Sequence, residues 1–203
     1  RTKKTKRDMT RAPKAETALD AIRKTICVSS FDGEHVLHET DLANEFGMSR
    51  TPIRQILQRL AYERLVLTRS GVGTVVTPLV EEHRSRDLCS YRGLIEAILL
   101  HDLPALSVSQ HSDVLALESF ANALQPDDPE LQYELLTRLH AIVVQLVDDP
   151  VLADAFSASF WRALRWHMRD LASDPQRATD APRARMARLV AYEDRQASDL
   201  FAR

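Results

Sequence analysis

Between positions 50 and 58 the sequence carries side chains that can read the edges of DNA bases. Arg50, Thr51, Arg54 and Gln55 lie close together, and Gln58 follows. Arginine can donate two hydrogen bonds to guanine, glutamine can pair with adenine, and threonine can bond a base or touch the thymine methyl group. The side-chain types therefore indicate a helix that reads the major groove, and the alternative is an ordinary solvated helix face.

The apolar residues of the same segment predict the helix that presents these side chains. They recur at the spacing of one helix face, which leaves the polar side chains on the opposite face. These apolar residues are Ile53, Ile56, Leu57, Leu60 and Ala61. Ser49 suits the N-cap, and Pro52 lies in the first turn, where a missing N–H costs little. The reading helix is expected to begin directly after Ser49.

The neighbouring segments predict the rest of a small DNA-binding domain. Helical spacing of apolar residues predicts one helix over 16–28 and a shorter one over 39–46, which Gly47 ends. After the reading helix, β-branched runs on both sides of the Ser70–Gly73 turn predict a hairpin over 65–77. Two helices joined by a short turn and followed by a hairpin form a winged helix-turn-helix, with Ser70–Gly73 as the wing.

Charge is distributed unevenly along the 203 residues, although the whole chain has a formal net charge of only -2. Residues 1–79 hold 14 Lys and Arg against 9 Asp and Glu, a net of +5, and the remainder has a net of -7. A basic N-terminal segment joined to an acidic remainder suits a protein whose N-terminal segment binds a polyanion. We expect a flexible basic arm over 1–14, the DNA-binding domain over 15–79 and a second domain over 80–203.

The segment from Leu42 to Leu57, LANEFGMSRTPIRQIL, strongly resembles the GntR family of bacterial regulators. The resemblance covers about 18–77 and includes a wing of the form GVGTVV at 71–76. It implies operator contacts by Arg50 and Arg54, with Thr51 beside them and Gly73 near the minor groove. The expected DNA-binding residues are Arg50, Thr51, Arg54, Gln55, Thr40, Arg69 and Gly73. The sequence departs from the family pattern at Thr40 and Val72, where many members have basic residues. Affinity for the DNA backbone is therefore expected to rest on Arg69 and the basic arm.

Residues beyond 80 show no strand-like alternation, and prolines divide them into about five helical blocks. Asp128-Pro129 and Asp149-Pro150 each place an N-cap ahead of a proline at the first helical position. The fold class is therefore mainly α, an N-terminal winged helix-turn-helix plus a C-terminal all-helical bundle. The stretch from Tyr91 to Ala97 also resembles the first helix of the helical effector domain of FadR-like members, whereas the other GntR effector domains contain strands.

Four polar side chains of this second domain are candidate effector ligands: Arg92, His140, His167 and Arg165. The histidines follow the apolar faces of their helices, and Arg92 shares a face with Leu88, Ile95 and Leu99. Guanidinium groups suit a carboxylate, so an organic or fatty acid is the expected effector. The structural alternatives are hydrogen-bonded core histidines and an Arg92–Glu96 pair within one helix.

In many FadR-like relatives this domain holds a divalent metal through one aspartate and three histidines, and His140 matches the first of the histidines. Leu136 occupies the aspartate position and no histidine follows His167, so we expect no metal ligands and no cofactor. Cys27 and Cys89 lack zinc-type spacing. The lack of any nucleophile motif or phosphate loop argues against a metal-dependent enzyme, which is the weakest alternative.

The expected function is transcriptional regulation through double-stranded DNA. A homodimer on a palindromic operator follows from the resemblance and from the two-fold geometry of helix-turn-helix proteins. A repressor controlled by a small-molecule effector is the expected form, and a degenerate helix-turn-helix that contacts proteins is the alternative. No apolar run is long enough to span a membrane, so a cytoplasmic location is expected.

Overall fold

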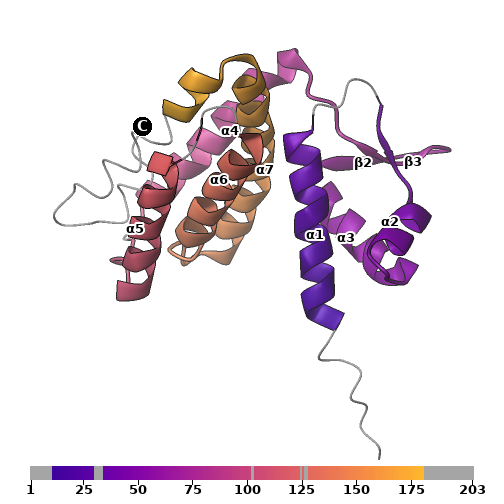
Figure 1. The fold of residues 1–203 in the computed structure, drawn as a ribbon, viewed down its shortest axis with the longest axis horizontal. Coiled ribbons are helices and arrows are strands. Elements are labelled where there is room, and N and C mark those ends of the chain that lie inside the picture. Colours follow the sequence, from indigo (N-terminus) through magenta and orange to yellow (C-terminus); the bar gives the residue numbers. More distant parts are fainter. Residues whose placement is uncertain (1–10, 30–33, 102, 124, 126–127, 181–203) are drawn as a thin grey trace, which may run out of the picture. The chain divides into compact units, whose positions relative to one another are not determined.

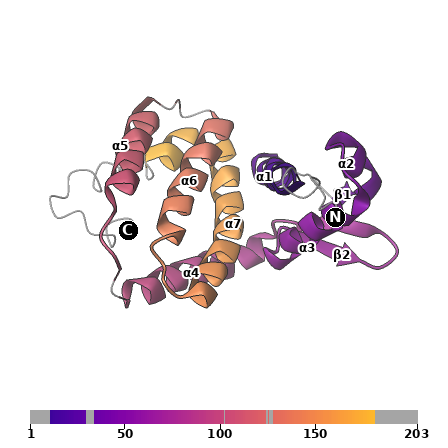
Figure 2. The same ribbon diagram turned by 90° about the horizontal axis from the view of Figure 1, so that it is seen from below.

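The computed structural model describes residues 11–29, 34–101, 103–123, 125 and 128–180. By its internal contacts the chain divides into two compact units, residues 1–78 and residues 79–203. Each unit is described by itself (Figures 1 and 2). The mainly helical fold, a small winged helix-turn-helix followed by a helical unit, agrees with the fold class that the sequence predicts.

The N-terminal unit contains three helices and a three-stranded sheet. Its helices are α1 (Arg11–Val28), α2 (Glu39–Glu45) and α3 (Arg50–Tyr62). Its strands are β1 (Val36–Leu37), β2 (Val66–Arg69) and β3 (Gly73–Val76), in the antiparallel order β1-β3-β2. Both α1 and α2 pack on α3. Figure 1 shows the β2–β3 hairpin projecting beyond α3 as a wing.

The predicted apolar stripe of α3 forms the centre of this unit and is buried apart from Ala61, which is half-buried. Ile53 and Leu60 have no exposed surface, and Ile56 and Leu57 are 5% exposed. They pack among buried residues of α1, α2 and the sheet, which include Ile22, Ile26, Leu42, Val66 and Val75. Gly47 ends the α2 segment with a φ of +58°, a conformation that favours glycine. The turn from α2 into α3 therefore forms as its sequence predicts.

Three details of this unit differ from the sequence prediction. Residues 11–14, assigned to the basic arm, begin α1, because Pro13 lies in the first helical turn and needs no hydrogen-bonded N–H there. The rest of the arm, residues 1–10, lies outside the described residues. Strand β1 was not predicted because its two residues show no alternation by themselves. Ser49 occupies the N-cap of α3, but its hydroxyl does not make the capping bond.

The C-terminal unit consists of helices over the part that the structure describes. They are α4 (Glu81–Leu99), α5 (Val108–Ala123), α6 (Pro129–Val144) and α7 (Pro150–Ser173), and residues 175–180 are also helical. The order of packing is α4 on α7, α7 on α6 and α6 on α5, as Figure 2 shows. Asp128 and Asp149 accept the predicted capping bonds from Leu131 N and Leu152 N, at 3.0 and 2.8 Å.

A polar network joins α4 to α7 beside the apolar core of this unit. Asp87 is buried and accepts hydrogen bonds from Trp166 Nε1 at 3.2 Å and from Arg162 Nη1 at 3.3 Å. Arg84 donates to Asp170 Oδ2 at 2.6 Å, and its guanidinium lies 5.6 Å from the Trp166 ring centre. The carboxylate of Asp87 therefore lies inside the unit with charged and hydrogen-bonded partners, as a buried charge requires.

The face of α4 that carries Arg92 is only partly buried. Ile98 is buried, and Tyr91 stacks on Phe156 with ring centres 5.4 Å apart. Ile95, which shares the face of Arg92, is half-buried and packs against the same core. Arg92 is exposed, and so is Leu99. The side chain of Arg92 therefore does not lie in the core of this unit.

Candidate nucleic-acid interface

The first two turns of α3 present a polar surface built from the predicted base-reading residues. Arg50 is the first residue of the helix, and Thr51, Arg54 and Gln55 follow within it, all with exposed side chains. Gln58 is exposed one turn later. The buried stripe on the opposite side of α3 fixes the rotation of the helix. The N-terminal end of α3 thus offers guanidinium, amide and hydroxyl groups together, as a recognition helix does.

A carboxylate of α2 holds one of these guanidinium groups. Arg54 Nε lies 2.9 Å from Oε1 and 2.8 Å from Oε2 of Glu39. The Arg54 side chain is 62% exposed and that of Glu39 is 34% exposed. Glu39 was not predicted as part of the site, because it precedes Arg54 by fifteen positions and no sequence spacing joins the two. The α2–α3 packing brings them together.

The wing supplies a further exposed cation. Arg69 ends β2 opposite Gly73, which begins β3, and the Arg69 guanidinium forms an ion pair with Glu34. Gly71 and Gly73 have φ values of +76° and +118°, so the turn uses conformations that favour glycine. Val72, between them, is exposed. Thr40, the remaining predicted residue, is exposed at the start of α2.

A buried ion pair ties α1 to the C-terminal end of α3. Arg23 Nε donates to Glu63 Oε2 at 2.9 Å, Arg23 Nη2 donates to Glu63 Oε1, and both side chains are 6% exposed. Burial by itself would lower the pKa of Arg23, but the hydrogen bonds and charges of Glu63 and Asp20 together outweigh it, so the pKa of the guanidinium is raised. Glu63 is the C-cap residue of α3, so this pair helps to fix the reading helix on its support.

The four predicted effector residues occupy different environments in the C-terminal unit. His140 is buried and stacks on Phe160, with ring centres 3.8 Å apart and an interplanar angle of 2°. Arg165 is buried on α7, and His167 is half-buried on the same helix. Arg92 is exposed on a surface of α4 that also carries Arg84, Ser85 and Cys89. Arg92 therefore does not share the buried environment of His140.

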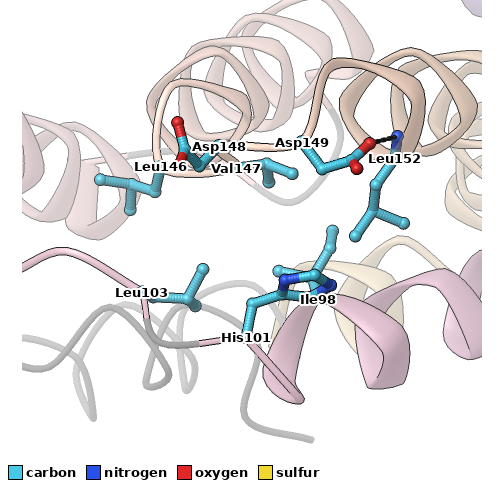
Figure 3. A pocket seen from close by; sticks show the side chains of 8 residues that line it. All are labelled: Ile98, His101, Leu103, Leu146, Val147, Asp148, Asp149 and Leu152. Carbon is cyan, nitrogen blue, oxygen red and sulfur yellow. Dashed lines mark hydrogen bonds between the residues drawn. The ribbon is translucent and has the colours of Figure 1, made fainter.

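A small hollow lies at the junction of α4, α6 and α7, away from these four residues (Figure 3). Its volume is about 100 Å³, and its lining includes His101, Leu103 and Asp148. The Asp149 carboxylate also lines it but is occupied with the amide of Leu152. Pockets for drug-sized ligands measure roughly 300–1,000 Å³. The hollow is too small for such a ligand.

Among the described residues, no three His, Cys, Asp or Glu side chains are grouped so that they could hold a metal ion. In the same part of the chain, no helix is long and apolar enough to cross a membrane.

The N-terminal unit also matches a known protein family. Residues 14–76 match the model of bacterial regulatory proteins, gntR family. These residues form a GntR-family DNA-binding domain. The matched range contains the whole polar surface of α3, Glu39 and the wing. The GntR domain accounts for about the first third of the chain.

Comparison with solved structures extends beyond the GntR domain. E. coli McbR/YncC is 16% identical, with 93% of this chain and 91% of that chain covered and a TM-score of 0.59, so the two share a fold. Lar, which controls the expression of the Listeria monocytogenes agr system, is 14% identical over 92% of this chain and 90% of its own, with a TM-score of 0.45. A GntR family regulator from Pseudomonas syringae pv. tomato is 19% identical over 87% of this chain and 80% of its own, with a TM-score of 0.37. No curated protein matches the chain.

Proposed function

We propose that this protein is a transcriptional regulator that binds a specific DNA sequence through α3 and the wing. The observation that carries the proposal is the exposed group of Arg50, Thr51, Arg54 and Gln55 at the N-terminal end of α3, within a domain of the GntR family. Arg50 and Arg54 supply bidentate donors for guanine, and Gln55 supplies a donor and an acceptor for adenine. We assign Arg69, Thr40 and Gly73 to contacts with the DNA backbone or the minor groove, and the support is their exposure on the wing and at the start of α2.

A homodimer on a palindromic operator is the assembly that we propose. One recognition helix covers only a few base pairs, and helix-turn-helix proteins gain affinity by placing two such helices about one turn of DNA apart. A two-fold dimer then reads two inverted half-sites. The shared fold with McbR/YncC over both units is consistent with a whole-chain regulator.

We propose in addition that the C-terminal unit binds a small-molecule effector, an organic or fatty acid, and that the protein acts as a repressor. The support is that His140 and Arg165 place polar groups among buried residues of this unit, with His167 half-buried on the same helix as Arg165. By linkage, an effector that weakens DNA binding must itself bind more weakly to the DNA complex. Arg92, exposed on α4, would serve as an outer contact.

Effector binding can be tested by tryptophan fluorescence. The rings of Trp161 and His140 have centres 6.2 Å apart, so a ligand that reaches His140 should change the emission. Short-chain and long-chain carboxylates would be titrated into wild type and His140→Ala. A saturable change in the wild type that His140→Ala abolishes supports the proposal. An unchanged emission with every carboxylate at millimolar concentration contradicts it.

The test of the DNA-binding proposal is selection of bound fragments from genomic DNA by the full chain. The wild type is expected to enrich fragments that share an inverted repeat, and the double variant Arg50→Ala/Arg54→Ala is expected to enrich none, because both guanine readers are removed. Circular dichroism would establish that the double variant is folded. Enrichment no better than random DNA by the wild type would overturn the proposal and favour a domain that contacts proteins instead.

A further inference from the structure

The carboxylate of Glu39 holds the side chain of Arg54, one of the proposed base-reading residues, in the unbound protein. Both carboxylate oxygens of Glu39 lie within 2.9 Å of Arg54 Nε. Glu39 lies in the first turn of α2, whose packing against α3 fixes its position relative to Arg54. An arginine side chain otherwise has several rotatable bonds and loses conformational freedom when it is ordered. The carboxylate therefore restricts the guanidinium in the unbound protein.

The geometry of the contact leaves the functional end of the guanidinium available. A guanidinium carries five N–H donors in one plane, one on Nε and two on each Nη. The bonds to Glu39 are made by Nε, so the two Nη groups at the far end are the donors that face away from this contact. A pair of parallel N–H groups is what guanine O6 and N7 accept. Glu39 can thus remain bound while Arg54 reads a base.

We propose that Glu39 is a positioning and specificity-determining residue, which aims Arg54 at its base and makes binding to other DNA less favourable. The inference rests on the proposed function and names how one of its contacts is controlled. A carboxylate partner lowers the net positive charge available to phosphates, which attract cations without regard to sequence. When Arg54 meets its base, the carboxylate orients it. When Arg54 meets no suitable base, the carboxylate opposes its use as a general phosphate contact.

The test compares two variants that each remove one negative charge from the first turn of α2. Glu39→Gln keeps the size of the side chain but loses the charge that holds Arg54. Asp41→Asn is the matched control, because Asp41 is also in this first turn and exposed, and the bonds to Arg54 come from Glu39. Full-length wild type and both variants would be selected in parallel on one library of randomised DNA duplexes. Affinities for the recovered wild-type duplex and for random duplex would then be measured.

We expect Glu39→Gln to lower the ratio of specific to random affinity by about two- to fivefold, the range of one exposed ion pair. The loss of preference should concentrate at one base pair, the one whose preference Arg54→Ala also abolishes. Asp41→Asn should raise affinity for both duplexes alike and leave the ratio unchanged. In an Arg54→Ala background, Glu39→Gln should no longer change the ratio, because the residue that it positions is absent.

Each other outcome has a distinct meaning. If Glu39→Gln and Asp41→Asn behave alike, or if Glu39→Gln changes the ratio equally with and without Arg54, the positioning role of Glu39 is wrong and DNA reading stands. If the wild type recovers no sequence at all, the proposed function fails and the role of Glu39 fails with it. Thermal unfolding of Glu39→Gln, followed by circular dichroism, should match the wild type within about 3 °C, since the contact is exposed. A larger loss of stability would assign Glu39 a structural role and contradict the proposal.

Discussion

Arg23→Met is expected to destabilise the N-terminal unit by about 3–5 kcal/mol, because it leaves the Glu63 carboxylate buried without its main partner. The two side chains are only 6% exposed, and Arg23 Nε donates to Glu63 at 2.9 Å. After the substitution, the remaining cation is Arg59, whose Nε lies 3.5 Å from Glu63 Oε1 and whose side chain is 56% exposed. Arg59 is partly solvated and compensates little, so we expect a value near 3 kcal/mol.

Urea unfolding can measure this loss separately for each unit. Both tryptophans, Trp161 and Trp166, lie in the C-terminal unit, so their fluorescence follows that unit while far-ultraviolet circular dichroism follows both. With a slope of about 1.5 kcal/mol per molar urea, a loss of 3 kcal/mol lowers the midpoint of the N-terminal transition by about 2 M. The urea midpoint of the C-terminal unit, followed by tryptophan fluorescence, should be the same in Arg23→Met as in the wild type.

Two further variants distinguish the buried pair from surface charge. Arg59→Ala removes the exposed partner of the same carboxylate and should cost less than about 1 kcal/mol. The double replacement Arg23→Met/Glu63→Leu removes both buried charges and should recover most of the lost stability, because apolar side chains of similar size avoid the desolvation cost. A midpoint shift below about 0.5 M for Arg23→Met would refute the reasoning, since the pair would then contribute no more than a surface contact.

Three other predictions concern the wing and the C-terminal unit. Val72→Lys should strengthen DNA binding and steepen the dependence of log affinity on log salt by about 0.9, and an unchanged slope would mean that the wing does not approach phosphates. Asp149→Ala should cost about 1 kcal/mol in the unfolding of the C-terminal unit through loss of the α7 cap, whereas Asp148→Ala should change it by less than about 0.5 kcal/mol. Trp166→Phe should cost about 1–3 kcal/mol in the same transition, because Asp87 loses a buried donor, and a stability equal to that of the wild type would contradict the assigned bond.

The parts of the fold that could be predicted from the sequence are those set by local patterns. The α3 stripe is continuous from Ile53 to Leu60, so it indicates both the helix and its buried face. Gly47, Gly71 and Gly73 mark positions of positive φ, and an aspartate ahead of a proline marks the start of α6 and of α7. These signals act within a few residues, which is why the winged helix-turn-helix and the two helix starts agree with the structure.

The features that the sequence did not indicate depend on contacts between distant segments. Glu39 meets Arg54 across fifteen positions and Arg23 meets Glu63 across forty, and both contacts require that α1 and α2 pack on α3. The exposure of Arg92 could not be predicted for the same reason, because it depends on how α4 packs on α7. Propensity and spacing carry no information on such partners.

The most direct test of the central claim, that α3 reads DNA bases, is the affinity of wild type and Arg54→Ala for one recovered duplex and its single-base variants, measured by fluorescence anisotropy at fixed salt. Wild type should lose about 1–3 kcal/mol of binding free energy when the guanine read by Arg54 is replaced. Arg54→Ala should bind the original duplex more weakly by a similar amount and show no preference at that position. If Arg54→Ala binds as tightly as wild type and keeps the full base preference, α3 does not read the sequence through Arg54 and the account is contradicted.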